Sequence, residues 1–227
     1  MTWVKICGIT NLEDAQTAVD AGADALGFVF YERSPRNIDR QVAREIVAKL
    51  PERVEKVGVF VNQSAEHINE ISRAVGITAV QLHEDVSPRG QTLQNLDPCY
   101  RSKTFVVLPA WQLFDEHGQF GGFGWRAELK DMISAIFVDS GTPQQPGGTG
   151  RTFDWDKAAP VAELIKQAGF TLVIAGGLTP TNAPKAIRIL KPWGVDVSSG
   201  VEVKPGKKDP EKVKAFITAV RQAERLA

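Results

Sequence analysis

Two side chains able to transfer protons each stand at the end of a short apolar run. Cys7 closes the run that begins at Trp3, and Asp139 follows Ala135–Val138. A thiolate and a carboxyl group are candidates for the base and the acid of a general acid–base reaction. Lys5 lies two residues before Cys7, so in a strand both side chains point to one face, and a cation roughly 7 Å away would favour the thiolate.

Each candidate also has a simple structural explanation. A lone cysteine such as Cys7 is usually a small buried apolar residue. Asp139 could be a turn residue, because Ser140 and Gly141 follow it. At an ordinary pKa of about 3.9, Asp139 would be ionised at neutral pH and unable to donate a proton, but burial after an apolar strand would raise that pKa.

Glycines gather after two later apolar runs. Gly176 and Gly177 follow Thr171–Ala175, and Ser199 and Gly200 follow a run that ends at residue 197. Bare backbone N–H groups at such positions can bind a phosphate group. Glycines that only shape turns would give the same pattern. These residues are therefore candidates for a phosphate site.

The chain repeats one pattern, a short apolar run followed by a turn and a helical stretch. Eight runs predict strands at Trp3–Cys7, Ala25–Phe30, Lys56–Val61, Ala79–Leu82, Ser102–Val107, Ala135–Val138, Thr171–Ala175 and Gly194–Val197. Apolar strands that alternate with helices indicate a parallel sheet covered by helices. Eight such units predict an α/β fold, a single-domain (βα)8 TIM barrel over residues 1–227, with a doubly wound open sheet as the alternative. In a barrel the candidates above would meet at one end, where the strands have their carboxyl ends.

Residues that cap helix N-termini mark the expected helix starts. Thr10 and Glu13 form a capping box before Asn11–Ala21. Further helices are expected after Asp39, Ser64, Asp154, Thr181 and Asp209. The apolar stripes of these helices include Val42, Ile46, Val47, Leu50, Ile68, Ile71, Val75, Val161, Leu164, Ile165, Ile187, Leu190, Val213, Phe216, Ile217 and Val220. The stretch 109–126 is the least regular and predicts an elaborated loop.

Composition narrows the protein class further. The chain has 27 Lys+Arg and 27 Asp+Glu, and this zero formal charge argues against a nucleic-acid partner. No apolar run is long enough to span a membrane, and the N-terminus does not resemble a secretory signal. Two cysteines, Cys7 and Cys99, suit a reducing cytosol rather than a disulfide framework. We expect a cytoplasmic monomer, since the helical faces are well charged.

A set of motifs spans nearly the whole chain in a fixed order. They are Lys5–Thr10, Gly27–Phe30, Ser34–Arg36, Gly58–Asn62, Val80–His83, Val138–Ser140, Gly147–Gly150, Phe153–Trp155, Ala175–Leu178, Asp196–Glu202 and Pro205–Asp209. This set resembles the phosphoribosylanthranilate isomerase family, the Amadori isomerases of tryptophan biosynthesis. The chain departs from the family pattern in two places: Glu84 stands where glycine is usual, and the loop after the fifth strand is longer.

The resemblance implies a reaction on a phosphosugar. Such an enzyme opens the ribose ring of N-(5-phosphoribosyl)anthranilate and moves the proton from C2, giving 1-(2-carboxyphenylamino)-1-deoxyribulose 5-phosphate. It implies Cys7 as the general base and Asp139 as the general acid, with no metal or organic cofactor. Arg36 would bind the anthranilate carboxylate through two parallel hydrogen bonds, and the alternative is a solvated loop arginine.

The resemblance also assigns the remaining site residues. The phosphate-binding residues would be Gly148, Gly150, Gly176, Gly177, Ser199 and Gly200. Asp196 would face the ribose hydroxyls or pair with Lys5, and His83 would be either a substrate contact or a hydrogen-bonded rim residue. His67 and His117 have no ligand spacing, so we predict no metal site.

Two other functions compete with this interpretation. The related histidine-pathway Amadori isomerase would use paired aspartates at the ends of the first and fifth strands, but Cys7 ends the first and no carboxylate follows Val107. A non-catalytic phosphate-binding barrel is the other alternative. Such a barrel would not need Cys7 and Asp139 to face each other across a pocket, because it carries out no proton transfer.

Overall fold

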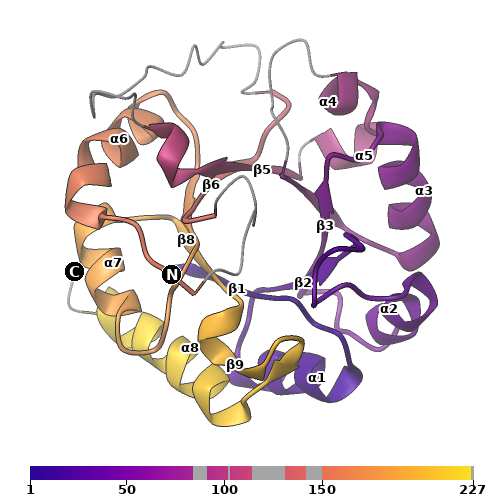
Figure 1. The fold of residues 1–227 in the computed structure, drawn as a ribbon, viewed down its shortest axis with the longest axis horizontal. Helices are drawn as coiled ribbons and strands as arrows, with labels where there is room; N and C mark the ends of the chain where they lie inside the picture. Colours follow the sequence, from indigo (N-terminus) through magenta and orange to yellow (C-terminus); the bar gives the residue numbers. More distant parts are fainter. Residues whose placement is uncertain (84–90, 102, 114–130, 142–149, 226–227) are drawn as a thin grey trace.

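The computed structural model describes residues 1–83, 91–101, 103–113, 131–141 and 150–225. Eight parallel strands form one closed barrel in chain order, and β8 pairs with β1 (Figure 1). The strands are β1 (Trp3–Cys7), β2 (Ala25–Val29), β3 (Glu55–Val61), β4 (Ala79–His83), β5 (Thr104–Pro109), β6 (Ala135–Asp139), β7 (Leu172–Ile174) and β8 (Gly194–Val197). The predicted (βα)8 barrel is confirmed, and the open-sheet alternative is wrong.

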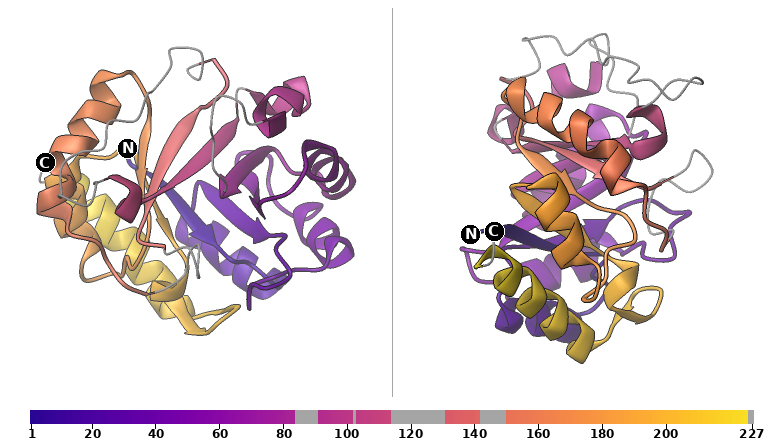
Figure 2. Two further views of the ribbon diagram at one scale, coloured as in Figure 1. Left: turned by 45° about the horizontal axis from the view of Figure 1, so that its top comes forward. Right: turned by 90° about the vertical axis from the view of Figure 1, so that its left-hand side faces the viewer.

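Helices cover the outside of the barrel (Figure 2). The longer ones are α1 (Leu12–Ala21), α2 (Arg40–Val47), α3 (Ala65–Val75), α6 (Trp155–Gln167), α7 (Ala183–Leu190) and α8 (Pro210–Glu224). Shorter elements fill the connections: α4 (Gln91–Asn95), α5 (Pro98–Arg101), and the 3-10 turns η1 (Ala110–Leu113) and η3 (Ser199–Val201). A hairpin of β9 (Glu202–Lys204) and β10 (Lys207–Lys208) lies outside the barrel sheet, and sequence analysis missed it.

Most of the expected helix starts are confirmed. The side chains of Asp39, Ser64, Asp154 and Asp209 accept hydrogen bonds from first-turn N–H groups of α2, α3, α6 and α8. The capping box at Thr10 is wrong, because Asn11 is the N-cap of α1 and accepts from the backbone N of Asp14. The helix predicted to start at Thr181 begins at Ala183.

Two residues placed on buried stripes are in fact exposed. Val42 is 41% exposed and Leu164 is 45% exposed. Each stands one residue before a member of the true stripe, Ala43 in α2 and Ile165 in α6. One residue turns the side chain by about 100° around a helix, which is enough to bring it to the surface.

The fifth strand was predicted two residues too early. The predicted range is 102–107, whereas β5 begins at Thr104 and ends at Pro109. The short helix α5 ends at Arg101, just before this strand, and the Thr104 hydroxyl donates to the carbonyl of Tyr100 at 2.7 Å. The end of this helix therefore delays the start of the strand.

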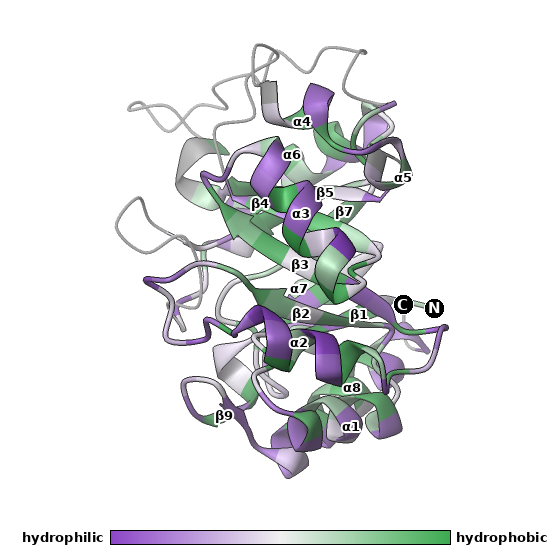
Figure 3. Ribbon diagram, turned by 90° about the vertical axis from the view of Figure 1, so that its right-hand side faces the viewer, coloured by the Kyte–Doolittle hydropathy of each residue, from purple (hydrophilic) through white to green (hydrophobic). Residues whose placement is uncertain are grey.

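Alternate strand residues point into the barrel and form layers. One interior cluster, which spans more than one layer, consists of Ala25, Val57, Ala79, Phe105, Val107, Ala135, Phe137 and Val173, with Trp3 packed against it. Cys7, Val29 and Val59 form a separate interior group. Figure 3 shows the apolar strands inside and the polar outer faces of the helices. In the parts of the chain that are described, no helix is long and apolar enough to cross a membrane.

Candidate active site

Cys7 is the last residue of β1 and lies inside the barrel, 8% exposed. Its partner on β2 is Gly27. A Cβ atom at Gly27 would lie 2.7 Å from Cys7 Sγ and 3.0 Å from Lys5 Cε. Glycine at this position therefore leaves the space that the thiol occupies. Gly27 belongs to one of the sequence motifs above, but no local pattern indicates this packing role.

Asp139 is the last residue of β6 and is also 8% exposed. Its Oδ1 accepts a 2.7 Å hydrogen bond from the backbone N of Gly141, which is the turn contact of the simple structural explanation. A protonated carboxyl group can still donate through its other oxygen. The turn contact and a role as an acid are therefore compatible.

The two proton-transfer candidates share one buried ion pair. Lys5 Nζ donates to Asp196 Oδ1 at 2.9 Å, and the lysine is fully buried. These two residues face each other directly in the β1–β8 register. The ammonium group also lies 5.5 Å from the ring centroid of Phe137. Because the charges of Lys5 and Asp196 act on both Cys7 and Asp139, the four titratable groups form one electrostatic unit.

Burial dominates the protonation of both candidates. It raises the pKa of the Cys7 thiol, although Lys5 acts in the opposite direction. Lys5 favours the thiolate as expected, but desolvation outweighs the nearby cation, so the net shift of the thiol pKa is upward. Burial also raises the pKa of Asp139 to about 7, although the hydrogen bond from Gly141 lowers it. The expected increase is confirmed, so Asp139 keeps its proton to a much higher pH than an exposed aspartate does.

Arg36 lies between β2 and α2, and its side chain is only 9% exposed. Its Nε and Nη2 donate to the two carboxylate oxygens of Glu202 at 2.9 and 2.7 Å. The alternative of a solvated loop arginine is therefore wrong. Gly8 makes room for the arginine, since a Cβ there would lie 2.6 Å from Arg36 Cδ, and its φ of 79° is one that favours glycine.

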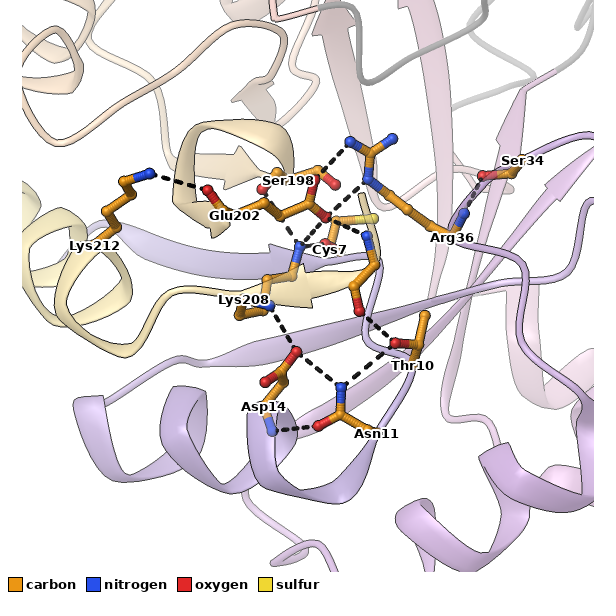
Figure 4. Close-up of polar contacts among 11 residues, drawn as sticks. Cys7, Thr10, Asn11, Asp14, Ser34, Arg36, Ser198, Glu202, Lys208 and Lys212 are labelled. Atoms are coloured by element: carbon orange, nitrogen blue, oxygen red, sulfur yellow. Dashed lines mark hydrogen bonds and ion pairs between the residues drawn. The ribbon is translucent and has the colours of Figure 1, made fainter. Parts of the chain in front are cut away.

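Glu202 also holds a second cation (Figure 4). Lys208 is fully buried in β10, and its Nζ donates to Glu202 Oε1 at 2.9 Å, to the carbonyl of Cys7 at 2.5 Å and to that of Ser198 at 3.3 Å. Burial alone would raise the pKa of Glu202, but Arg36 and Lys208 lower it, so the carboxylate stays charged. We call Arg36, Glu202 and Lys208 the Glu202 cluster. No local pattern in the sequence indicates a role for Glu202 or Lys208.

The glycines after β7 and β8 pack against neighbouring loops. Gly176 and Gly177 have φ values of 81° and 64°, and a Cβ on either would lie 2.3 Å from an atom of the segment after β6. A Cβ at Gly200 would lie 1.8 Å from the carbonyl oxygen of Leu178. The carboxyl ends of β6, β7 and β8 therefore meet through bare backbone. A larger residue at any of these glycines would disturb the packing of the protein itself.

Of the remaining residues singled out in the sequence, some lie within the described ranges and others do not. A Cβ at Gly150 would lie 3.9 Å from Ser199 Oγ, so the segment after β6 adjoins η3. Gly148 and Glu84 lie outside the described residues, as does most of the stretch 109–126.

His83 ends β4 and has a hydrogen-bonded ring. Its Nε2 lies 3.1 Å from Nε2 of Gln81 on the same strand. This contact fits a rim residue, and contact with substrate stays a prediction. Within the described ranges, no group of three His, Cys, Asp or Glu side chains could hold a metal ion.

Comparison with known proteins gives a family for this barrel. A family model described as N-(5'-phosphoribosyl)anthranilate (PRA) isomerase matches residues 4–219. The chain belongs to this family. It is therefore an enzyme, an isomerase, and the resemblance seen in the motifs is confirmed.

Individual PRA isomerases match over almost their full length. That of Chlorobaculum parvum is 42% identical over 226 residues, covering 100% of this chain and 98% of the relative. That of Pelobacter propionicus is 45% identical over 222 residues, covering 98% and 97%. The Thermotoga maritima crystal structure has a TM-score of 0.80 at 38% identity, covering 98% and 100% of the two chains. A crystal structure of a phosphoribosyl anthranilate isomerase in complex with reduced 1-(o-carboxyphenylamino)-1-deoxyribulose 5-phosphate has a TM-score of 0.77 at 36% identity, with the same coverage.

The raised pKa of Asp139 predicts how this residue affects stability. Between the unfolded pKa of about 3.9 and the folded pKa of about 7, the folded state binds one proton more than the unfolded state. Asp139 therefore contributes stability that is present at low pH and is lost as the pH rises to about 7, at about 1.4 kcal/mol per pH unit. Asp139→Asn should raise the Tm at pH 8 relative to wild type, and the gain should shrink towards pH 4.5.

The matched control for this measurement is Asp131→Asn, because Asp131 is an exposed carboxylate just before β6. Its Tm difference from wild type should not depend on pH in this way. A Tm difference for Asp139→Asn that stays constant between pH 4.5 and pH 8 would show that burial of the Asp139 carboxylate does not destabilise the fold.

Proposed function

We propose that this protein converts N-(5-phosphoribosyl)anthranilate into 1-(2-carboxyphenylamino)-1-deoxyribulose 5-phosphate in tryptophan biosynthesis, with Cys7 as general base and Asp139 as general acid. The observation that carries the proposal is the buried unit of Cys7, Lys5, Asp196 and Asp139 inside a barrel of this family. Groups with strongly perturbed pKa values in one such unit are typical of functional sites. The names of the relatives and the ligand of one similar PRA isomerase structure support the choice of substrate.

Two proton transfers are sufficient for this reaction. Asp139 in its acid form donates a proton to the furanose ring oxygen, the bond from that oxygen to C1 breaks, and a Schiff base forms. Cys7 as thiolate then takes the proton from C2, and the resulting enolamine tautomerises to the ketone. One acid and one base carry both steps, so the proposal includes no metal and no organic cofactor.

The phosphate is proposed to lie on the glycine-rich strand ends. Backbone N–H groups of the residues after β7 and β8 would bind it, together with the segment after β6: Gly148, Gly150, Gly176, Gly177, Ser199 and Gly200. The position of these residues after β7 and β8, where TIM barrels commonly bind phosphate, supports the assignment. We further propose that Asp196, which Lys5 holds in place, and His83 contact the ribose.

Three wider expectations stay predictions. They are a single domain over residues 1–227, a cytoplasmic location and a monomeric state. The T. maritima relative is described as dimeric, so a monomeric state of this protein would differ from that relative.

Loss of the fluorescence of N-(5-phosphoribosyl)anthranilate on addition of the purified protein tests the activity and the two assignments together. Without added metal, wild type should turn over the substrate, and EDTA should have no effect. Cys7→Ser provides a far poorer base and Asp139→Asn has no acidic proton, so each should lower kcat by roughly 10²- to 10⁴-fold, with a smaller change in KM.

Cys99→Ser is the matched control, because Cys99 is the exposed cysteine and should leave kcat unchanged. If Cys7→Ser or Asp139→Asn kept more than about half of the wild-type kcat, that residue would be misassigned. Inhibition of wild type by EDTA would contradict a reaction without metal. A wild-type protein that left the fluorescence unchanged would refute the proposed function.

The pH profile of kcat/KM follows from the two raised pKa values. The reactive form, thiolate with protonated Asp139, carries the same total charge as thiol with ionised Asp139, so the ratio of these two forms does not change with pH. The pair loses its first proton near the Asp139 pKa of about 7 and its second at the raised pKa of Cys7. We expect kcat/KM to rise with pH through about 7 and to fall only at alkaline pH. A fall through pH 7 would mean that Cys7 is already a thiolate in the free enzyme.

Arg36 is proposed to recognise the anthranilate carboxylate. Arg36→Met keeps the apolar part of the side chain and removes the guanidinium group with its paired N–H donors. Hydrogen bonds to charged groups contribute about 1.5–3 kcal/mol. KM should therefore rise about tenfold or more, since about 1.4 kcal/mol corresponds to a factor of ten. Arg36→Lys should restore only part of the lost affinity, because an ammonium group cannot donate two parallel hydrogen bonds to one carboxylate. Equal inhibition of wild type and Arg36→Met by the reaction product would place carboxylate recognition on another residue.

A further inference from the structure

We infer that Glu202 is a positioning residue for carboxylate recognition, which holds one edge of the Arg36 guanidinium and leaves the other edge for the substrate. The inference rests on the proposed function, because it gives Glu202 a role only through Arg36. It assigns a task to a buried carboxylate that the proton transfers themselves do not use.

The hydrogen-bond geometry of Arg36 leaves a second pair of N–H donors on its guanidinium group available. A guanidinium group has five N–H donors. The Nε hydrogen and one Nη2 hydrogen point to the two oxygens of Glu202. Two hydrogens on Nη1 and one on Nη2 remain. One of the Nη1 hydrogens and the remaining Nη2 hydrogen lie side by side and form the outer edge that suits a second carboxylate. In the described part of the chain, no residue accepts a hydrogen bond from Nη1, and Figure 4 shows only one edge of the guanidinium against Glu202.

Glu202 is itself held from several directions. Its Oε1 accepts from Lys208 Nζ at 2.9 Å and from the backbone N of Gly206 at 3.2 Å. Its backbone carbonyl accepts from Lys212 Nζ at 3.0 Å. The carboxylate therefore has little freedom to move, and it fixes the plane of the guanidinium that it binds. A recognition group that is already ordered loses less entropy when its ligand binds.

The stem of Arg36 is fixed as well. It lies over Gly8, where even a single Cβ atom would come within 2.6 Å of Arg36 Cδ. Gly8 directly follows Cys7, and Lys208 joins the carbonyl of Cys7 to Glu202. The Glu202 cluster therefore holds the carboxylate-binding edge at a set place relative to the end of the strand that carries the base.

The three donors of Lys208 are fully used in this arrangement. They reach the carbonyls of Cys7 and Ser198 and the carboxylate of Glu202. Lys208 has no donor left for a substrate group. We therefore assign carboxylate binding to the outer edge of Arg36 and a supporting role to Lys208.

The test compares two inhibitors that differ only in the carboxylate. One is the reduced carboxyphenylamino-deoxyribulose phosphate, and the other is the corresponding phenylamino compound without the carboxylate. Glu202→Asp keeps the negative charge but withdraws it by one methylene group from Arg36. We expect inhibition by the carboxylate compound to weaken about tenfold, the size of one charge-assisted contact, and inhibition by the phenyl compound to change less than about twofold.

Glu13→Asp is the matched control. Glu13 binds the same hairpin through Lys207, at 2.8 Å, but it belongs to α1 and does not touch Arg36. It should leave inhibition by both compounds unchanged. In the Arg36→Met background, Glu202→Asp should produce no further loss for the carboxylate compound, since its effect passes through Arg36.

Each outcome separates this inference from the function on which it rests. If Arg36→Met loses discrimination between the two compounds and Glu202→Asp keeps it, Glu202 is not a positioning residue, while the proposed function stands. Equal weakening of both compounds in Glu202→Asp would show a merely structural role. If the wild type turns over substrate but binds both compounds equally, carboxylate recognition by Arg36 fails, and the inference fails with it.

A measurement on the wild type keeps the inference testable if the variant does not fold. In a crystal structure with the carboxylate compound bound, Arg36 should keep Nε and Nη2 on Glu202 and give Nη1 and Nη2 to the ligand. An Arg36 side chain that leaves Glu202 when the ligand binds would overturn the inference.

Discussion

One buried ion pair constrains the interior of this barrel. A charge that leaves water loses a large hydration energy, so a lysine at the barrel centre requires a partner of opposite charge at hydrogen-bond distance. Lys5 has that partner in Asp196, its direct neighbour across the β1–β8 pairing. Closure of the barrel and neutralisation of the buried charge are therefore the same event. Cys7 and Asp139, at the ends of their strands, then titrate in an environment that this pair defines.

The site balances desolvation against nearby charge, and desolvation is the larger effect on both proton-transfer candidates. A more exposed Cys7 would release its proton more easily but would lie outside the interior into which β1 directs it. An exposed Asp139 would be ionised and unable to donate. The Glu202 cluster shows the opposite balance, since two cations around one carboxylate outweigh its burial. The same fold thus raises the pKa of the Asp139 carboxyl group and lowers the pKa of the Glu202 carboxyl group.

Local pattern was sufficient to predict the strands, most helix starts and the strand-end residues. Two kinds of feature could not be predicted: contacts between residues far apart in the sequence, and the degree to which a side chain is buried. The sequence places Lys5 two residues from Cys7, and Lys5 lowers the thiol pKa as expected. The sequence does not show how completely water is excluded, so it does not reveal that burial raises this pKa by more. Arg36 and Glu202 are 166 residues apart, and no spacing rule connects them. The hairpin that carries Lys208 is short and charged, which is the usual pattern of a solvated loop rather than of a fully buried amine.

The long separation between Lys5 and Asp196 has a consequence for synthesis of the protein. During translation the ribosome produces Lys5 first and its partner 191 residues later. Until then a nascent chain that packed β1 into an apolar interior would bury an ammonium group without compensation, so the complete interior cannot form on a growing chain. Helices and neighbouring strand pairs can form earlier, because their contacts are local. Completion of the candidate active site is thereby linked to the synthesis of β8, which carries Asp196.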